Sequence, residues 1–291
     1  MNKRTLGEKI FDSCNILFLL LLSFSTVYPL IHVAFASFSD GNMLMTHFGF
    51  LFHPLNPTLD GYIAVFKNKF VLTGYRNTLF IIVVGVALNL FMTAISAYAL
   101  TREGMMLKKP ILLFIIFTMY FSGGLIPGYL NIKSLGLIDN LFVLIIPAAM
   151  SAFNFLILKT FFESIPSSLE ESARIDGANE LVVLFRIIIP LSLPAMAVIA
   201  LYYGVAHWNS YFSAMLYIRT KSLYPLQLVL RELLLTSESN AMATGDTGAA
   251  NNLYETLKYA LIMVATVPIL VVYPFLQRYF VKGALIGAVK G

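Results

Sequence analysis

Six long stretches of apolar residues dominate the sequence, separated by shorter polar segments. They lie at about 14–38, 77–100, 110–130, 140–162, 184–207 and 257–281. A stretch of about 20 apolar residues is long enough to cross a hydrocarbon core of about 30 Å. Backbone groups in lipid must bond within the protein, and these stretches lack the period-2 alternation of barrel strands. The pattern predicts an all-α integral membrane protein with six transmembrane helices.

Composition agrees with this fold class. Of 291 residues, 58% are hydrophobic and 12% are charged, with a mean hydropathy of +0.80; soluble proteins carry about 25% charged residues. The net charge of +5 arises from Lys and Arg that flank the apolar stretches, so it indicates no nucleic-acid partner. Cys14 is the only cysteine, which excludes an internal disulfide and a cysteine-based metal cluster.

The first apolar stretch resembles a secretory signal in one respect, because Lys3, Arg4 and Lys9 precede it. It is longer than the usual hydrophobic region of a signal peptide, and Tyr28-Pro29 makes a poor cleavage site. We therefore expect a retained first helix. With the amino terminus in the cytoplasm, the larger share of Lys and Arg falls on the cytoplasmic side, as the positive-inside rule requires. Six helices then place both termini in the cytoplasm.

Two loops on the opposite side are long. Residues 59–66 have apolar positions at near-helical spacing, which predicts a helix on the membrane surface. Asn77-Thr78 follows and is expected to cap the second membrane helix, because Asn is a favoured N-cap residue. The other loop covers 218–256, and its middle, 236–252, is small and polar. We interpret that middle as a flexible spacer rather than a binding element, since it cannot bury enough apolar surface to order itself.

The third apolar stretch contains a cluster of helix-weakening residues, Met119–Gly128. Gly and Pro here predict a kink or break, tolerated where backbone is buried in protein or faces water. The alternative is close helix packing through small residues. Asp139 or Asn140 is then expected to cap the next helix.

A short charged segment, 167–180, lies between the fourth and fifth apolar stretches. Ser167 or Ser168 can cap a short helix here, and a glutamate three residues later would complete a capping box. Glu170 and Arg174 are four residues apart and can pair across one turn. Gly177 is expected to end this helix in the left-handed conformation.

A second helix is expected from about Asn179, with Pro190 and Pro194 distorting its first turns. The predicted element is a helix of about 9 residues, a glycine elbow and another helix. A short helix of this kind can lie in a groove of a soluble partner, with the small Ala173 keeping one face low. The alternative interpretation is a solvated connector with ordinary caps.

The pattern Glu-Ser-Ala-x-x-Asp-Gly-Ala, followed by a proline, resembles the cytoplasmic coupling loop of importer permeases in the ATP-binding-cassette (ABC) class. In those proteins the loop docks on the ATPase. The residues that carry this resemblance here are Glu170, Glu171, Ser172, Ala173, Arg174, Asp176, Gly177, Ala178 and Pro190. Ser172 stands where the family has alanine; Ser is also small, so docking is expected to survive.

Three further stretches resemble carbohydrate importers of the maltose and oligosaccharide permease type. They are Tyr62 with Phe66 and Asn77-Thr78, the string 121–127 with 135–139, and the tail 277–291. The string Phe-Ser-Gly-Gly-Leu-Ile-Pro is most similar to permeases for complex or uronate-type oligosaccharides. The resemblance implies a type I ABC importer permease fold with a cytoplasmic coupling helix. It also implies an N-terminal part (1–71), a transmembrane domain (72–277, with the coupling loop at 167–190) and a cytoplasmic tail (278–291).

The resemblance further implies a heteromeric importer in a bacterial plasma (inner) membrane. The chain would pair with a second related permease, bind a cytoplasmic ATPase dimer through 167–180, and receive sugar from an extracytoplasmic solute-binding protein. The sequence contains no Gly-x-x-x-x-Gly-Lys-Ser/Thr phosphate loop. We therefore expect a non-catalytic subunit that binds no cofactor or metal itself, with ATP and Mg²⁺ bound by the partner ATPase.

Polar groups in membrane helices point inward, so they are candidates for contacts to a sugar. The candidates are Tyr120, Ser122, Asn154, Tyr203, His207, Trp208 and Asn209. Aromatic residues near a helix end are alternatively belt residues at the membrane surface, and Asn154 is alternatively an interhelical hydrogen bond. The sugar contacts could also lie mainly on the partner permease.

Three other functions compete with the sugar importer. An ion-coupled secondary transporter predicts ionisable residues in mid-helix, which the apolar stretches do not offer. A channel or scaffold would not need the charged segment. An importer of the same mechanism but with non-sugar cargo stays open, because the charged segment does not discriminate cargo.

Overall fold

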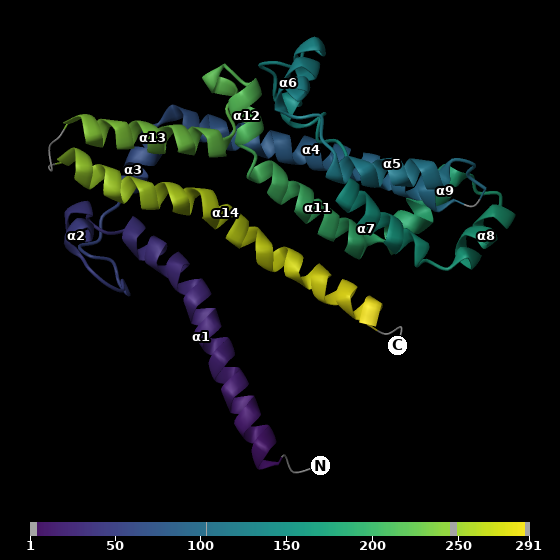
Figure 1. Ribbon diagram of the computed structural model, residues 1–291, viewed down its shortest axis with the longest axis horizontal. Helices are drawn as coiled ribbons and strands as arrows, with labels where there is room; N and C mark the ends of the chain where they lie inside the picture. The colour runs from purple at the N-terminus through teal and green to yellow at the C-terminus, as the bar shows by residue number, and fades with distance from the viewer. Residues whose placement is uncertain (1–4, 103, 245–248, 289–291) are drawn as a thin grey trace. The chain divides into compact units, whose positions relative to one another are not determined.

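The computed structural model describes the backbone of residues 5–102, 104–244 and 249–288, and every regular element in those ranges is helical (Figure 1). The chain divides into two compact units. One comprises 1–68 with 230–267, and the other comprises 69–229 with 268–291. The predicted division at 71/72 and 277/278 stays a prediction.

The first unit contains three helices from the amino-terminal part and two segments from the carboxyl-terminal part. They are α1 (Leu6–Ser37), α2 (Gly41–Thr46), α3 (Asp60–Lys67), most of α13 (Leu226–Thr244) and the first part of α14 (Ala249–Ala288). Thr5 and Glu8 form a capping box at the start of α1, because each side chain accepts the other's backbone N–H. The helix predicted at 59–66 is confirmed by α3.

Close backbone contacts hold this unit together. A Cβ built on Gly41 would lie 2.1 Å from the carbonyl oxygen of Asn252, so α14 packs directly on the start of α2. Ser39 Oγ accepts the backbone N–H of Leu55 at 2.9 Å, and the Tyr28 hydroxyl accepts that of Leu51 at 2.8 Å. The loop between α2 and α3 is therefore fixed by the end of α1.

The second unit has α4 at its centre. Its elements are α4 (Lys69–Thr101), α5 (Lys108–Tyr120), α6 (Leu125–Ser134), η1 (Leu141–Leu144), α7 (Ala152–Glu163), α8 (Ser167–Ile175), α9 (Glu180–Val183), the π-helical η2 (Leu184–Ile188), α10 (Ile189–Leu191), α11 (Leu193–Trp208), α12 (Phe212–Tyr217), η3 (Lys221–Leu223) and the rest of α14. α4 packs against α7 and α11, and its core includes the fully buried Phe155, Leu158, Ile188 and Ile199.

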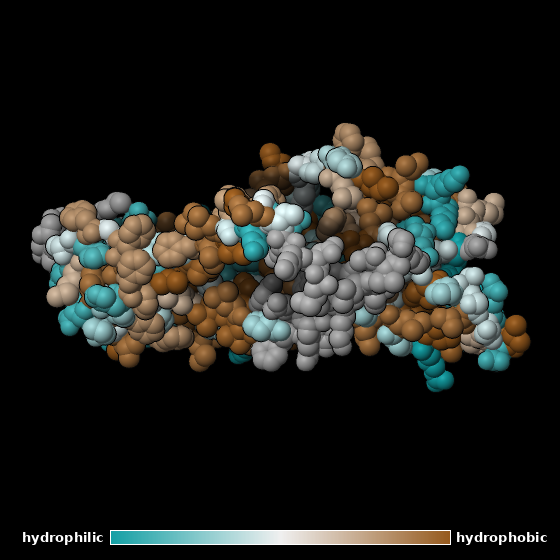
Figure 2. Space-filling model, turned by 90° about the horizontal axis from the view of Figure 1, so that it is seen from below, coloured by the Kyte–Doolittle hydropathy of each residue, from teal (hydrophilic) through white to brown (hydrophobic). Residues whose placement is uncertain are grey.

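Apolar side chains dominate the surface, as the face in Figure 2 shows. Among the described residues, three helical ranges are long and apolar enough to cross a membrane: Leu6–Ser37, Lys69–Thr101 and Asn252–Val272. Two bent pairs, α5 with α6 and the range Glu180–Leu191 with α11, bring the number to five if each pair is one span. The count of six therefore stays a prediction.

The predicted break in the third stretch is confirmed. α5 and α6 meet at an angle of 115°, and Gly124 between them has a φ of +87°. A Cβ built on Gly123 or Gly128 would have no atom within 4 Å. The alternative of close packing through these glycines within the chain is therefore wrong.

Three predicted elements are wrong in detail. The fourth stretch is not one helix, because Pro147 lies in a non-helical segment between η1 and α7. Residues 236–244 are helical as the end of α13, since a helix that has already formed extends at little cost; 245–248 lie outside the described residues. Asn77 does not cap a helix, because α4 begins at Lys69; its amide instead donates to the backbone oxygens of Ser222 and Tyr224.

Candidate functional site

The charged segment forms the predicted helix, glycine elbow and helix. α8 has 9 residues and ends at the C-cap Asp176. Gly177 follows with a φ of +82°, in the left-handed region. Asn179 then caps α9, its side chain accepting the backbone N–H of Val182 at 2.9 Å. The sequence alone therefore predicted the backbone conformation of this segment.

The expected capping box at the start of α8 is wrong. Pro166 occupies the N-cap position, and no side chain caps the helix. α8 buries Glu170 and Ala173 and exposes Leu169 and Ile175, the latter at 86%. Ala173 therefore packs against the protein's own core. The expectation that it keeps an outer face of the helix low for a partner is wrong.

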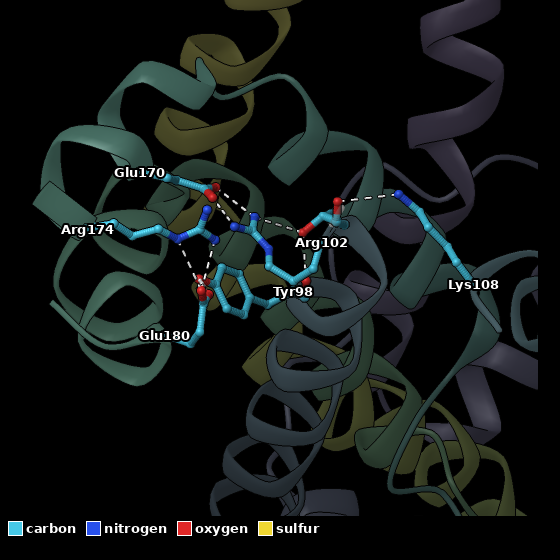
Figure 3. Close-up of polar contacts among 7 residues, drawn as sticks. Tyr98, Arg102, Lys108, Glu170, Arg174 and Glu180 are labelled. Atoms are coloured by element: carbon cyan, nitrogen blue, oxygen red, sulfur yellow. Dashed lines mark hydrogen bonds and ion pairs between the residues drawn. The ribbon is translucent and has the colours of Figure 1, made fainter. Parts of the chain in front are cut away.

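Glu170 pairs with Arg102, not with Arg174 (Figure 3). Arg102 is the residue after α4, and its Nη2 donates to Glu170 Oε1 at 2.7 Å. Arg174 instead donates to Glu180 Oε1 at 2.9 Å, across the elbow. The predicted i,i+4 pair fails because Glu170 lies on the buried face of α8, where α4 ends.

Tyr98 completes this group. Its hydroxyl donates to Glu180 Oε2 at 2.6 Å, and the Arg102 guanidinium lies 4.1 Å from the centre of its ring. We call Tyr98, Arg102, Glu170, Arg174 and Glu180 the hinge cluster. Three of its members were missed by sequence reasoning. The signal that could have found Arg102 and Tyr98 is their place at the end of the second apolar stretch.

Other predicted residues of the segment lie around this cluster. Glu171, Ser172 and Asp176 are exposed, and Ala178 is half-buried against the core. Pro190 lies in α10, just before Ser192, where the helix bends by 83°. The expected distortion near Pro190 and Pro194 is thereby confirmed.

A cavity of about 630 Å³ opens in the same unit, between α7, α11, α12 and the non-helical segment before α7. Three of the seven candidate sugar contacts, Asn154, Tyr203 and His207, line it. Sequence reasoning missed other lining residues, and those with aromatic rings or hydroxyl groups are Ser151, Phe153, Tyr202, Ser210, Ser213 and Tyr217. These residues were hard to predict from the sequence because each lies outside any motif.

Buried polar groups support the cavity wall. The Tyr203 hydroxyl accepts the Ser151 N–H at 2.9 Å and bonds Thr93 Oγ1 at 2.8 Å. Asn89 donates through its amide to the carbonyl of Ala148 and bonds His207 Nε2 through Oδ1 at 2.8 Å. Side chains of α4 and α11 thus bond two backbone groups of the non-helical segment 145–151, beside the local turn bonds that the segment makes itself.

The other four candidates are not brought together with these three. Tyr120 is 78% exposed at the end of α5, and Ser122 is exposed in the break after it. Trp208 is buried and lines a different, apolar cavity. The Asn209 amide donates to the backbone oxygen of Val205 in its own helix. Among the described residues, no group of three or more His, Cys, Asp or Glu side chains could hold a metal ion.

Asp139 holds the loops beside this cavity together. Its carboxylate accepts the Thr220 hydroxyl at 2.6 Å and the backbone N–H groups of Thr220 and Arg219 at 2.8 and 2.9 Å. The hydrogen bonds from Thr220, followed by that from Arg219, lower the pKa of Asp139 below its ordinary value of 3.8. The backbone N–H of Asp139 also donates to the carbonyl of Tyr217, which fixes the backbone of this lining residue.

The family model described as "Binding-protein-dependent transport system inner membrane component" matches residues 78–285. The chain belongs to this family. The family comprises the permease subunits of ABC importers, so the predicted importer permease, a non-catalytic subunit, is confirmed. The ion-coupled secondary transporter and the channel are excluded.

Relatives of this permease extend over almost its whole length. It is 42% identical over 285 residues to the polygalacturonan/rhamnogalacturonan transport system permease protein YtcP of Bacillus subtilis (strain 168), with 98% of this chain and 99% of that one covered. It is 44% identical over 288 residues to Protein LplC of the same organism, with 99% and 97% covered.

Solved structures of ABC importers share its fold. A chain of a bacterial ABC transporter that imports the acidic polysaccharide alginate matches with a TM-score of 0.85 and 34% identity, covering 96% of this chain and 100% of that one. A second alginate transporter structure, in complex with an alginate pentasaccharide-bound periplasmic protein, matches with a TM-score of 0.60 and 16% identity, covering 94% and 96%. The chain is thus an integral membrane permease with the ABC permease fold.

Proposed function

We propose that this permease is one of two that form the translocation path of an ATP-driven importer for uronate-containing oligosaccharides. The relatives named above for polygalacturonan/rhamnogalacturonan and alginate transport support that cargo class. The importer lies in a bacterial plasma membrane and receives its cargo from an extracytoplasmic binding protein. A second permease and a cytoplasmic ATPase dimer, which binds ATP and Mg²⁺, complete it.

The ATPase docks on the outer face of α8, on the cytoplasmic side, where both termini of the chain also lie. Docking of the ATPase there is supported by the difference between the two faces of α8. Its inner face is tied to α4 by the Arg102–Glu170 ion pair, while Ile175 on the opposite face and Leu169 at the edge of the inner face stay exposed. A short helix with exposed apolar side chains can be bound by a groove in a partner.

Through the hinge cluster, a movement of α8 is transmitted to the membrane helices. Because Arg102 follows α4 directly and Glu180 begins α9, a force on α8 is delivered to both helices without an intervening flexible segment. Coupling travels through packed and hydrogen-bonded contacts of this kind. ATP binding and hydrolysis in the partner would thereby change the orientation of α4 and of the helix pair α9–α11.

The test is assembly and transport of an Ile175→Arg variant. Ile175 is 86% exposed, so the change spares the core of this chain but places a charge where the ATPase is expected to bind. We expect the variant to insert and retain the second permease, but to lose the ATPase in detergent pull-downs and uptake in vesicles. The matched control is Met106→Arg, which is 97% exposed near Arg102 but off α8.

An ATPase that stays with the Ile175→Arg variant at wild-type yield would refute docking on this face. Wild-type vesicles that hydrolyse ATP but accumulate no uronate oligosaccharide, yet do accumulate another solute, would refute the cargo and leave the coupling intact.

A further inference from the structure

The cavity beside α11 has the groups that bind a sugar ring. Phe153 and Tyr202 both line it, are 55% and 42% exposed, and their ring centres lie 6.3 Å apart at an angle of 42°. Deeper in the wall, Asn154 is buried at 5% exposure and His207 at 6%. Its volume of about 630 Å³ lies within the range of about 300–1,000 Å³ typical of small-molecule sites.

The wall also indicates that this cavity faces water or cargo rather than lipid. Segment 145–151 crosses the wall without helical structure, and irregular backbone at membrane depth is tolerated only when buried in protein or lining a watery cavity. Pro147, Ala148 and Met150 from this segment line the cavity and are exposed.

Among the described residues that line this cavity, none is Lys, Arg, Asp or Glu. Arg219 is the cation nearest in sequence, two residues after the lining Tyr217, and its guanidinium donates to the Tyr129 hydroxyl at 3.4 Å. Lys159 on α7 pairs with Glu163 at 2.6 Å. A carboxylate inside this cavity would therefore lose water without a cation among the lining residues to pair with it.

We propose that this cavity is a subsite for one uncharged pyranose ring of a cargo that joins neutral and uronate rings, as a rhamnogalacturonan does. The inference rests on the proposed function and deepens it, because it assigns the uncharged rings and the uronate rings of the cargo to different sites. The ring's apolar faces contact Phe153 and Tyr202, and its hydroxyl groups bond the Asn154 amide and the hydroxyl of Ser210. Uronate carboxylates of the cargo lie outside this cavity.

His207 lines this subsite, and its ring can offer a hydrogen-bond acceptor. Asn89 donates through its amide to Ala148, so its Oδ1 must accept and His207 Nε2 must donate. In the neutral ring the other nitrogen then carries a lone pair. A sugar hydroxyl can donate to that lone pair, whereas a carboxylate has no proton to give.

The test is protection of an engineered thiol from labelling, using the complete importer in detergent. Cys14 is the chain's only cysteine, so a Cys14→Ser background leaves a single thiol in this chain when Ser213→Cys is added. The two probes are α-1,4-linked galactotriose and trigalacturonate, which share their linkage and differ at C6, a hydroxymethyl group in the first and a carboxylate in the second. We expect galactotriose to protect the thiol at a concentration about tenfold lower, because the carboxylates of the other probe find no partner.

Two further variants sharpen the result. Tyr202→Leu in the same background should raise the protecting galactotriose concentration about tenfold, through loss of one aromatic contact. Ala206→Lys adds a cation to the cavity wall and should reverse the preference between the two probes. Tyr120→Cys is the control thiol, because Tyr120 lies outside the cavity and is 78% exposed; neither probe should protect it.

Uptake by the same Ser213→Cys importer in vesicles separates this inference from the proposed function. Uptake of uronate oligosaccharides without protection of the thiol by galactotriose would overturn the subsite and leave the proposed function standing. Stronger protection by trigalacturonate than by galactotriose would overturn its preference for an uncharged ring. Absence of uptake of any oligosaccharide by the wild-type importer would overturn the proposed function itself.

Discussion

Arg102 and Glu170 form an ion pair between the end of α4 and the middle of α8, across 68 residues of sequence. Their side chains are 20% and 10% exposed, so both charges are largely removed from water. Removal of one partner leaves the other charge buried and unmatched, which costs more than the pair contributes. The pair therefore both fixes α8 and makes its position sensitive to single substitutions.

Arg102→Met and Glu170→Gln should each lower the free energy of unfolding by about 2 kcal/mol, because each removes a charge-assisted hydrogen bond. The double variant should lose at least about 1 kcal/mol less than the sum of the two. Denaturant titration of the purified chain in detergent measures this. Strictly additive losses would mean that the two side chains do not interact in solution.

Gly85 and Gly204 are a matched pair of helical glycines on α4 and α11. A Cβ on Gly85 would lie 2.6 Å from His207 Nε2, whereas one on Gly204 would lie 4.0 Å from the Val86 side chain. Gly85→Ala should displace His207 from Asn89 and cost about 2 kcal/mol. Gly204→Ala should be neutral or stabilise by about 0.5–1 kcal/mol. Thermal unfolding of both variants compares them directly, and equal midpoints would contradict the close contact.

Gly177 adopts a positive φ, and the space around it is open, with no atom within 4 Å of a built Cβ. Gly177→Ala therefore costs only the backbone strain of the left-handed region, about 1–2 kcal/mol. We expect the strain to be relieved by a change of the elbow, so ATP hydrolysis persists while uptake falls severalfold. Gly123→Ala is the control, since Gly123 also has open space but no positive φ. Full uptake by Gly177→Ala would show that the elbow angle does not matter.

Asp139 should make stability depend on pH in the acid range. Its pKa is lowered in the folded protein, chiefly by Thr220. Its contribution to stability is therefore present above the ordinary value of 3.8 and is lost as the pH falls through the lowered, folded-state pKa. Asp139→Asn keeps the left-handed backbone, which Asn tolerates. We expect the difference in unfolding midpoint between wild type and this variant to shrink as the pH falls below 4; a constant difference would contradict the shift.

The sequence predicted elements whose cause is local. Gly177 and Asn179 mark the elbow because a left-handed glycine and an Asn N-cap act within three residues. The break at 121–124 is likewise explained by its own Gly residues. These features depend on backbone preferences that a single residue supplies, so they can be read without knowing the fold.

Predictions that depend on contacts between residues distant in sequence were less accurate than those with a local cause. Glu170 was assigned to Arg174 by spacing, but its partner is Arg102, which no local pattern indicates. Sequence reasoning named three residues of the cavity wall, because buried polar residues such as Asn154 stand out in an apolar stretch, whereas Phe153 and Tyr202 look like lipid-facing aromatics. Only packing reveals which side of a membrane helix faces a cavity.

Segment 145–151 has a consequence for the order in which this chain is made. Its backbone is held by Asn89 from α4 and by Tyr203 from α11, and the second of these is synthesised some fifty residues later. Without these two side chains, the Ala148 carbonyl and the Ser151 N–H would lack their partners in lipid, which is costly. Segment 145–151 therefore reaches its final conformation only after α11 has left the ribosome and entered the membrane. The folding of this region is completed later than its position in the sequence suggests.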